Sequence, residues 1–144
     1  MRELQPDKKR RKTRGKTKSV ASLKKLADTI FSQYIRLRDA DSNGYLDCIT
    51  CGREYHWKQA QAGHFVSRKV SLLRFDETNV NGQCVGCNMF KAGEQYAYSK
   101  ALDLKYGKGT AEKLWNRRFE THKFTIGELE LLIEEYKEKV KEEL

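Results

Sequence analysis

The sequence of 144 residues has no long apolar run, and this absence excludes membrane-spanning proteins. No stretch approaches the roughly 18 apolar residues that a transmembrane helix requires. The segment Met1–Asp7 is followed by charged residues rather than by an apolar stretch, so we expect no secretory signal. We therefore expect a protein of a reducing compartment, the cytoplasm, with no membrane partner.

The chain has four cysteines and no others outside two C-x2-C pairs. These pairs are Cys48 with Cys51 and Cys84 with Cys87. One tetrahedral zinc ion needs four ligands, and each tight turn offers two sulfurs at a suitable distance. Disulfide pairing is the alternative, which a reducing compartment disfavours. The spacing predicts a structural Zn²⁺. Because sulfur then fills every ligand position, this zinc cannot be a catalytic metal.

The charge is concentrated at the N-terminus. Residues 1–25 contain eleven Lys/Arg against two Asp/Glu, and residues 26–144 contain eighteen of each, so the net charge of +9 lies in the first 25 residues. Such a run repels itself and stays disordered until it meets a polyanion, which it binds in a salt-sensitive way. A solubilising tail or a targeting signal is the alternative; we expect DNA. The candidate DNA-binding residues here are Lys8, Lys9, Arg10, Arg11, Lys12 and Arg14.

Helical periodicity and turn signals predict an α+β fold with flanking N- and C-terminal helices. The expected units are a disordered basic arm (1–18), an N-terminal helix (19–41), a zinc-bound core (42–106) and a C-terminal helical extension (107–144). Within them we expect a helix at 22–38, extended segments at 45–49, 55–57, 61–66 and 79–83, and helices from Cys87 to Gly107, at 110–120 and from Thr125 onward.

The last of these helices carries an apolar seam that steps by three and four residues. The seam is shorter than three heptads, so packing on the domain is favoured over a coiled-coil dimer. Its residues are Ile126, Leu129, Ile133, Tyr136 and Val140.

Histidine, whose ordinary pKa suits a general base, occurs only three times. His122 lies in a charged stretch and is expected at the solvated surface. His56 adjoins Trp57, where packing and a phosphate contact are both reasonable. His64 follows Gly63 beside the cysteine frame. Taken alone, a histidine in a strand is more often structural than catalytic.

Four segments of the chain, taken in sequence order, resemble the HNH nucleases of the ββα-metal superfamily and, more closely, the phage NinG (Rap) recombination endonucleases. The resemblance extends from about residue 34 to residue 141. It implies a zinc-stabilised ββα-metal core and a metal-dependent endonuclease of the host cytoplasm that cuts branched DNA, such as Holliday junctions and D-loops. The segments that carry it are Tyr34–Asp39, Ala62–Phe65, Leu73–Asn79 and Gln83–Asn88.

The resemblance also implies a role for each matching residue. His64 matches the general base. Asn88 matches a helical position whose side-chain oxygen ligates Mg²⁺ or Mn²⁺. Asn79 matches an asparagine that bridges the hairpin or orients the histidine, and a structural role is favoured. Candidate phosphate contacts, for which an ordinary solvated side chain is the alternative, are Arg68, Lys69, Arg74 and, on the same helix as Asn88, Lys91.

One position departs from the family pattern. Many HNH enzymes place an aspartate or histidine before the base as a second metal ligand, but Gly63 has no side chain. Asp76 and Glu77 are the candidates to replace it. Magnesium often keeps several waters, so a short ligand set is not disabling.

Two other functions compete with the nuclease. A non-catalytic zinc module could bind DNA or RNA through the basic arm, but this function leaves His64 and Asn88 unexplained. An interaction protein could use its last helix to bind a partner. Symmetrical cleavage of a junction would imply a homodimer, for which the helical seam is only a suggestion.

Overall fold

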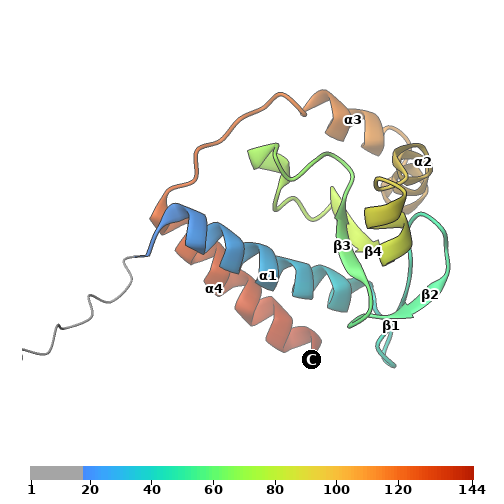
Figure 1. The fold of residues 1–144 in the computed structure, drawn as a ribbon, viewed down its shortest axis with the longest axis horizontal. Helices are drawn as coiled ribbons and strands as arrows, with labels where there is room; N and C mark the ends of the chain where they lie inside the picture. The colour runs from blue at the N-terminus through green and yellow to red at the C-terminus, as the bar shows by residue number, and fades with distance from the viewer. Residues whose placement is uncertain (1–17) are drawn as a thin grey trace, which may run out of the picture.

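The computed structural model describes residues 18–144, which contain four α-helices and two short antiparallel strand pairs (Figure 1). This arrangement confirms the predicted α+β class. The basic arm up to Thr17 lies outside the described residues. The helices are α1 (Val20–Asp39), α2 (Gln95–Tyr106), α3 (Thr110–Asn116) and α4 (Ile126–Glu143). The strands are β1 (Tyr45–Asp47), β2 (Glu54–His56), β3 (Gln61–His64) and β4 (Val80–Gln83), with a 3₁₀ turn at Ser71–Leu73 and a π-helical turn at Gly86–Phe90.

Helix α1 begins at a capping box. Ser19 Oγ accepts from the backbone N–H of Ser22, and Ser22 Oγ accepts from the N–H of Ser19, both at 3.1 Å. These bonds satisfy two donors that have no partner within the helix. Helix α1 thus begins two residues before the predicted start at residue 22, and the predicted helix at 22–38 lies within it.

Helices α1 and α4 lie side by side and enclose the larger apolar core (Figure 1). The rings of Phe31 and Tyr136 meet edge to face, with centroids 4.8 Å apart. The seam of α4 packs on α1, which confirms packing on the domain as its main role: Leu129, Ile133, Tyr136 and Val140 are buried, and Ile126 at the start of the helix stays 43% exposed.

A buried polar network joins the end of α1 to β4. The Arg38 guanidinium donates to the carbonyls of Glu77 and Val80, and the Asp39 carboxylate accepts from the N–H of Gly82 at 2.7 Å. Burial opposes ionisation of Asp39, but the adjacent Arg38 outweighs it and holds the pKa of this carboxyl below its ordinary value. The network fixes the β3–β4 hairpin against α1.

The helix predicted after Cys87 differs in the structure. A π-helical turn ends at Phe90, and α2 begins only at Gln95. Between them Ala92, Gly93 and Glu94 all have positive φ, between +50° and +83°, which a right-handed helix cannot accommodate. Asn88 therefore lies on a separate turn, and Lys91 lies just beyond that turn rather than on a shared helix.

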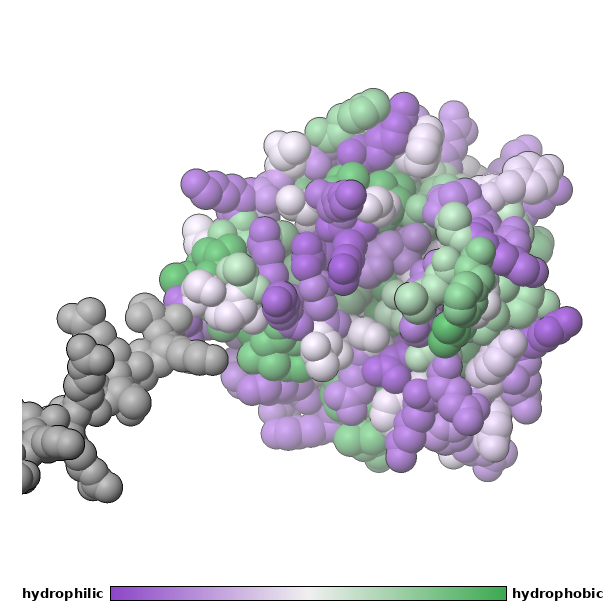
Figure 2. Space-filling model, viewed as in Figure 1, coloured by the Kyte–Doolittle hydropathy of each residue, from purple (hydrophilic) through white to green (hydrophobic). Residues whose placement is uncertain are grey.

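Polar side chains cover most of the face drawn in Figure 2, and apolar residues form separate patches on it. Within residues 18–144 no helix is both long enough and apolar enough to cross a membrane.

Two leucines on α4 test the packing of this helix. Leu129 is fully buried, and Leu131 is 74% exposed. We expect Leu129→Ala to lower the free energy of unfolding by about 3 kcal/mol, because it leaves a cavity in the core. The matched Leu131→Ala change should alter it by less than about 0.5 kcal/mol. Urea denaturation measures both, and equal losses would contradict the packing described here.

Candidate nuclease and metal site

The four cysteines come together in the structure. Their sulfurs all lie within 4.8 Å of one another, and Cys51 Sγ is 3.9 Å from Cys84 Sγ. In a tetrahedral site with Zn–S bonds of about 2.3 Å, sulfurs are about 3.8 Å apart. The cluster could therefore hold a metal ion such as zinc, as the spacing predicts.

Backbone N–H groups donate to two of these sulfurs. Cys48 Sγ accepts from the N–H of Cys84 at 3.3 Å, and Cys84 Sγ accepts from the N–H of Cys87 at 3.4 Å. Burial opposes ionisation of the Cys48 thiol, but hydrogen bonds from Thr50 Oγ1 and neighbouring backbone groups lower its pKa to about 6. A thiolate at neutral pH is the form that binds a metal.

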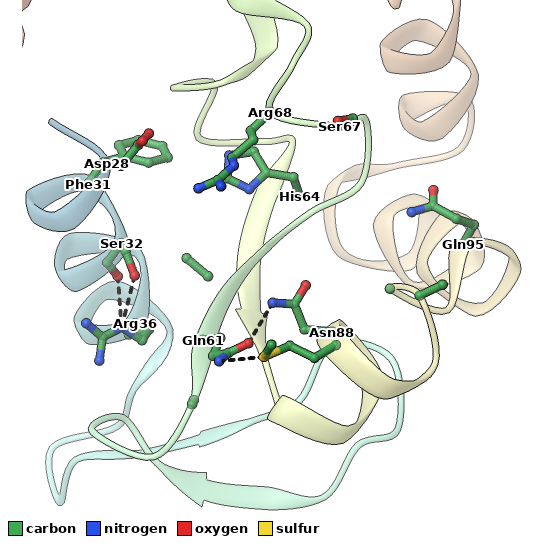
Figure 3. Close-up of a pocket in the computed structure, with 15 residues that line it drawn as sticks. Asp28, Phe31, Ser32, Arg36, Gln61, His64, Ser67, Arg68, Asn88 and Gln95 are labelled. Carbon is green, nitrogen blue, oxygen red and sulfur yellow. Dashed lines mark hydrogen bonds between the residues drawn. The ribbon is translucent and has the colours of Figure 1, made fainter. Parts of the chain in front are cut away.

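The hairpin of β3 and β4 places two of the predicted site residues on one cavity (Figure 3). His64 ends β3, and Asn88 lies on the turn that follows the second cysteine pair; both line a cavity of about 840 Å³. The opposite wall belongs to α1. Residues 24 positions apart in the sequence thus face the same space.

The imidazole of His64 is held by a backbone carbonyl. Its Nε2 lies 2.9 Å from the carbonyl oxygen of Arg74. Because a carbonyl can only accept, Nε2 carries the proton, and Nδ1 of the neutral ring keeps a free lone pair. Burial lowers the pKa of His64 below its ordinary value and outweighs the opposing effects of the Arg74 carbonyl and the Asp28 carboxylate. The ring is therefore neutral at pH 7.

Arg74 itself is anchored to α1. Its guanidinium binds Asp28 through two hydrogen bonds, of which the Nε–Oδ1 bond measures 2.9 Å. Such a two-point contact fixes orientation as well as distance. The Arg74 side chain, which was a candidate phosphate contact, thus binds Asp28 instead. The backbone carbonyl of Arg74 positions His64.

The side chain of Asn88 is oriented by β3. Its Nδ2 donates to Gln61 Oε1 at 2.8 Å, and in Figure 3 its Oδ1 points away from Gln61. Mg²⁺ and Mn²⁺ prefer oxygen ligands. The chemistry of Asn88 therefore fits the metal-binding role that the resemblance implies.

Asn79 lies behind the site. Its side chain is fully buried; Oδ1 accepts from the N–H of Val66 at 2.8 Å, and Nδ2 donates to the carbonyls of Val66 and Leu73. These bonds hold the loop between β3 and β4, which contains Arg74. Asn79 thus supports the position of His64 from a distance and does not line the cavity.

The two carboxylates proposed as a second metal ligand lie elsewhere. Asp76 Oδ1 accepts from the N–H groups of Thr78 and Asn79, and Glu77 pairs with Lys139 of α4 at 3.4 Å. Neither lines the cavity. Asp76 thus binds backbone groups of its own loop, and Glu77 faces α4. This pair therefore does not supply the metal ligand that a side chain at Gly63 would provide.

Two arginines, Arg36 and Arg68, line the cavity. Arg68 is exposed at its edge and has no ion-pair partner among residues 18–144, so its guanidinium can meet a phosphate. Arg36 also lines it, but donates to Ser32 and to the carbonyl of Trp57. Lys69 does not line the cavity, and Lys91 lies outside it, 3.9 Å from Glu94.

Comparison with known proteins gives the family. The sequence matches the family described as Bacteriophage Lambda NinG protein over residues 1–143. The chain belongs to the NinG family. It is 33% identical over 119 residues to Protein ninG of Escherichia phage lambda, covering 82% of this chain and 55% of that protein. Protein ninG of Salmonella phage P22 is 33% identical, and Protein ninG of Escherichia phage 933W is 32% identical. Each of these matches covers 82% of this chain and 56% of the relative.

This NinG chain thus spans about half the length of the curated relatives it matches. No solved structure matches the chain.

Sequence reasoning missed the contribution of α1 to this NinG site. Asp28, Ser32 and Arg36 recur every fourth residue and line the cavity. Residues four apart share one face of a helix. This polar stripe beside the apolar one therefore predicts a second, polar face of α1.

The cysteine cluster predicts one zinc ion per NinG chain by elemental mass spectrometry of the purified protein. Cys84→Ser should abolish this stoichiometry and lower the thermal unfolding midpoint by about 10 °C or more, because metal binding contributes to folding. Folded, zinc-free protein with a disulfide among these cysteines would contradict the assignment.

Proposed function

We propose that this chain is a metal-dependent DNA endonuclease of the HNH type that hydrolyses phosphodiester bonds in branched recombination intermediates, such as Holliday junctions and D-loops. The observation that carries the proposal is the joint placement of His64 and Asn88 on one basic cavity. The succession of hairpin, turn and helix from β3 to α2 supports it, because it is the order of a ββα unit. The preference for branched DNA rests on the family resemblance alone.

His64 is the general base of the proposed reaction. Its Nε2–H is committed to the Arg74 carbonyl, so Nδ1 accepts the proton of the water that attacks phosphorus. Asp28 fixes the Arg74 side chain, and Asn79 fixes the loop around it. The base is therefore positioned by contacts that do not depend on bound substrate.

The cavity also provides for the charge of the phosphate. Arg68 would pair with a phosphate oxygen, and Asn88 Oδ1 would hold a Mg²⁺ or Mn²⁺ ion. When bound, such an ion offsets the negative charge that builds on the phosphate during hydrolysis. Zinc held by the four sulfurs has a structural role in this proposal, because four thiolates leave no position open.

DNA is the proposed polyanion for the basic N-terminal segment as well. The net charge of +9 of the whole chain is carried by residues 1–25. Binding through such a segment releases counterions, so affinity would fall steeply with salt and would not depend on sequence.

Cleavage of a four-way junction and of linear duplex, each with Mg²⁺, Mn²⁺ or EDTA, tests the proposal. We expect metal-dependent cutting by the wild type and a loss of about 10²–10⁴-fold in single-turnover rate for His64→Ala. His122→Ala is the matched control, because His122 lies before α4 and contacts Glu128. It should cut at the wild-type rate.

A pH profile completes this test. The base must be neutral, so the rate should rise with pH and level off at a lower pH than it would for a histidine of ordinary pKa, because burial lowers the pKa of His64. DNA binding without cutting by any form of the protein would instead support a non-catalytic zinc module, and unimpaired cutting by His64→Ala would remove this histidine from the mechanism.

A further inference from the structure

The amide of Gln83 is fully buried and only half satisfied. Its Nε2 donates to the carbonyl of Gly93 at 2.9 Å and to Thr50 Oγ1 at 3.1 Å. A carbonyl can only accept, so the amide cannot be turned over, and the position of Oε1 is fixed. Among residues 18–144, this Oε1 is the only buried side-chain nitrogen or oxygen without a hydrogen-bond partner. Leaving an acceptor in this state is costly, which calls for a reason.

The oxygen lies against Gly63. A Cβ built on Gly63 would come within 2.0 Å of Gln83 Oε1, far inside any real contact. A side chain at position 63 would therefore displace the Gln83 amide from its bonds to Gly93 and Thr50. The oxygen occupies the space in which a side chain at position 63 would begin, directly before His64.

The same end of the hairpin holds the amide of Asn88. Gln83 pairs across the strands with Gln61, and directly opposite residues point their side chains to the same face. Gln61 in turn accepts from Asn88 Nδ2. Gly93, whose carbonyl receives the Gln83 amide, lines the same cavity as Asn88. Within residues 18–144, two amide oxygens, Asn88 Oδ1 and Gln83 Oε1, thus accept from no donor; Asn88 lines the cavity, and the buried Gln83 lies behind its lining.

We propose that Gln83 Oε1 is the second protein ligand of the divalent cation that Asn88 binds, and that it takes the place of the missing side chain at Gly63. The inference rests on the proposed function, because that function supplies the cation. Neutral amide oxygens are ligands for hard cations, and Mg²⁺ or Mn²⁺ completes its shell with water and phosphate.

Binding of Mn²⁺ to the zinc-loaded full chain, followed by electron paramagnetic resonance, tests the assignment without measuring activity. Gln83→Met keeps the shape but removes the oxygen, and should weaken Mn²⁺ binding by about tenfold or more. Gln59→Met, on the exposed turn before β3, is the matched control and should bind Mn²⁺ as the wild type does.

Gln83→Glu separates a ligand from a packing residue. A carboxylate binds the cation more tightly than an amide, but it cannot donate to the Gly93 carbonyl. We expect tighter Mn²⁺ binding together with a lower thermal unfolding midpoint in the absence of Mn²⁺. A purely structural Gln83 would give the lower midpoint without the tighter binding, and that result would overturn the proposal.

A double substitution tests the exchange of positions. Gly63→Asp alone should destabilise the fold, because its Cβ meets Gln83. Gly63→Asp combined with Gln83→Ala removes the clash and returns an oxygen ligand, so Mn²⁺ binding lost in Gln83→Ala should be restored. If the double variant binds Mn²⁺ no better than Gln83→Ala, the proposal fails.

These outcomes are distinguishable from failure of the nuclease proposal. Wild-type protein that cuts DNA while Gln83→Met and Gln83→Glu bind Mn²⁺ unchanged would sink only the role of Gln83. Wild-type protein that neither binds Mn²⁺ in this cavity nor cuts DNA would overturn both.

Discussion

Strands β3 and β4 pair over four residues each, and this short antiparallel contact sets the position of His64 and leads into the turn that carries Asn88. His64 ends one strand, and Cys84 directly follows the other. The pairing is held from one side by Arg38 and Asp39 of α1 and from the other by Tyr98 of α2, whose hydroxyl donates to the Gly63 carbonyl at 2.6 Å. A hairpin this short is not stable alone, so the helices and the cysteine cluster are needed to hold it.

Much of this arrangement can be read from the sequence, because it depends on local rules. Apolar residues at three- and four-residue steps mark α1 and α4. Two C-x2-C pairs predict the sulfur cluster, since each pair needs only its own turn to place two thiols. The apolar seam of α4 also predicts packing on the domain, which the structure confirms.

The remaining features depend on contacts between distant segments, and no local rule reveals them. Asp28 reaches Arg74 across 46 positions, and Gln83 fills the space beside Gly63 only because the strands pair in one register. Asp76 and Glu77 are near His64 in sequence but turn to other partners. The interruption before α2 arises from three consecutive residues with positive φ. Among them only Gly93 is of a residue type that favours positive φ and could be recognised from the sequence.

We propose that the cysteines hold a structural metal and that the chemistry belongs to the cavity of His64 and Asn88. Crystals of the full chain soaked with Mn²⁺, with anomalous diffraction collected at the zinc and manganese edges, test it most directly. We expect zinc among the four sulfurs and manganese about 2.0–2.6 Å from Asn88 Oδ1. Manganese absent from this cavity, or zinc bound at His64 with the cysteines empty, would contradict the account.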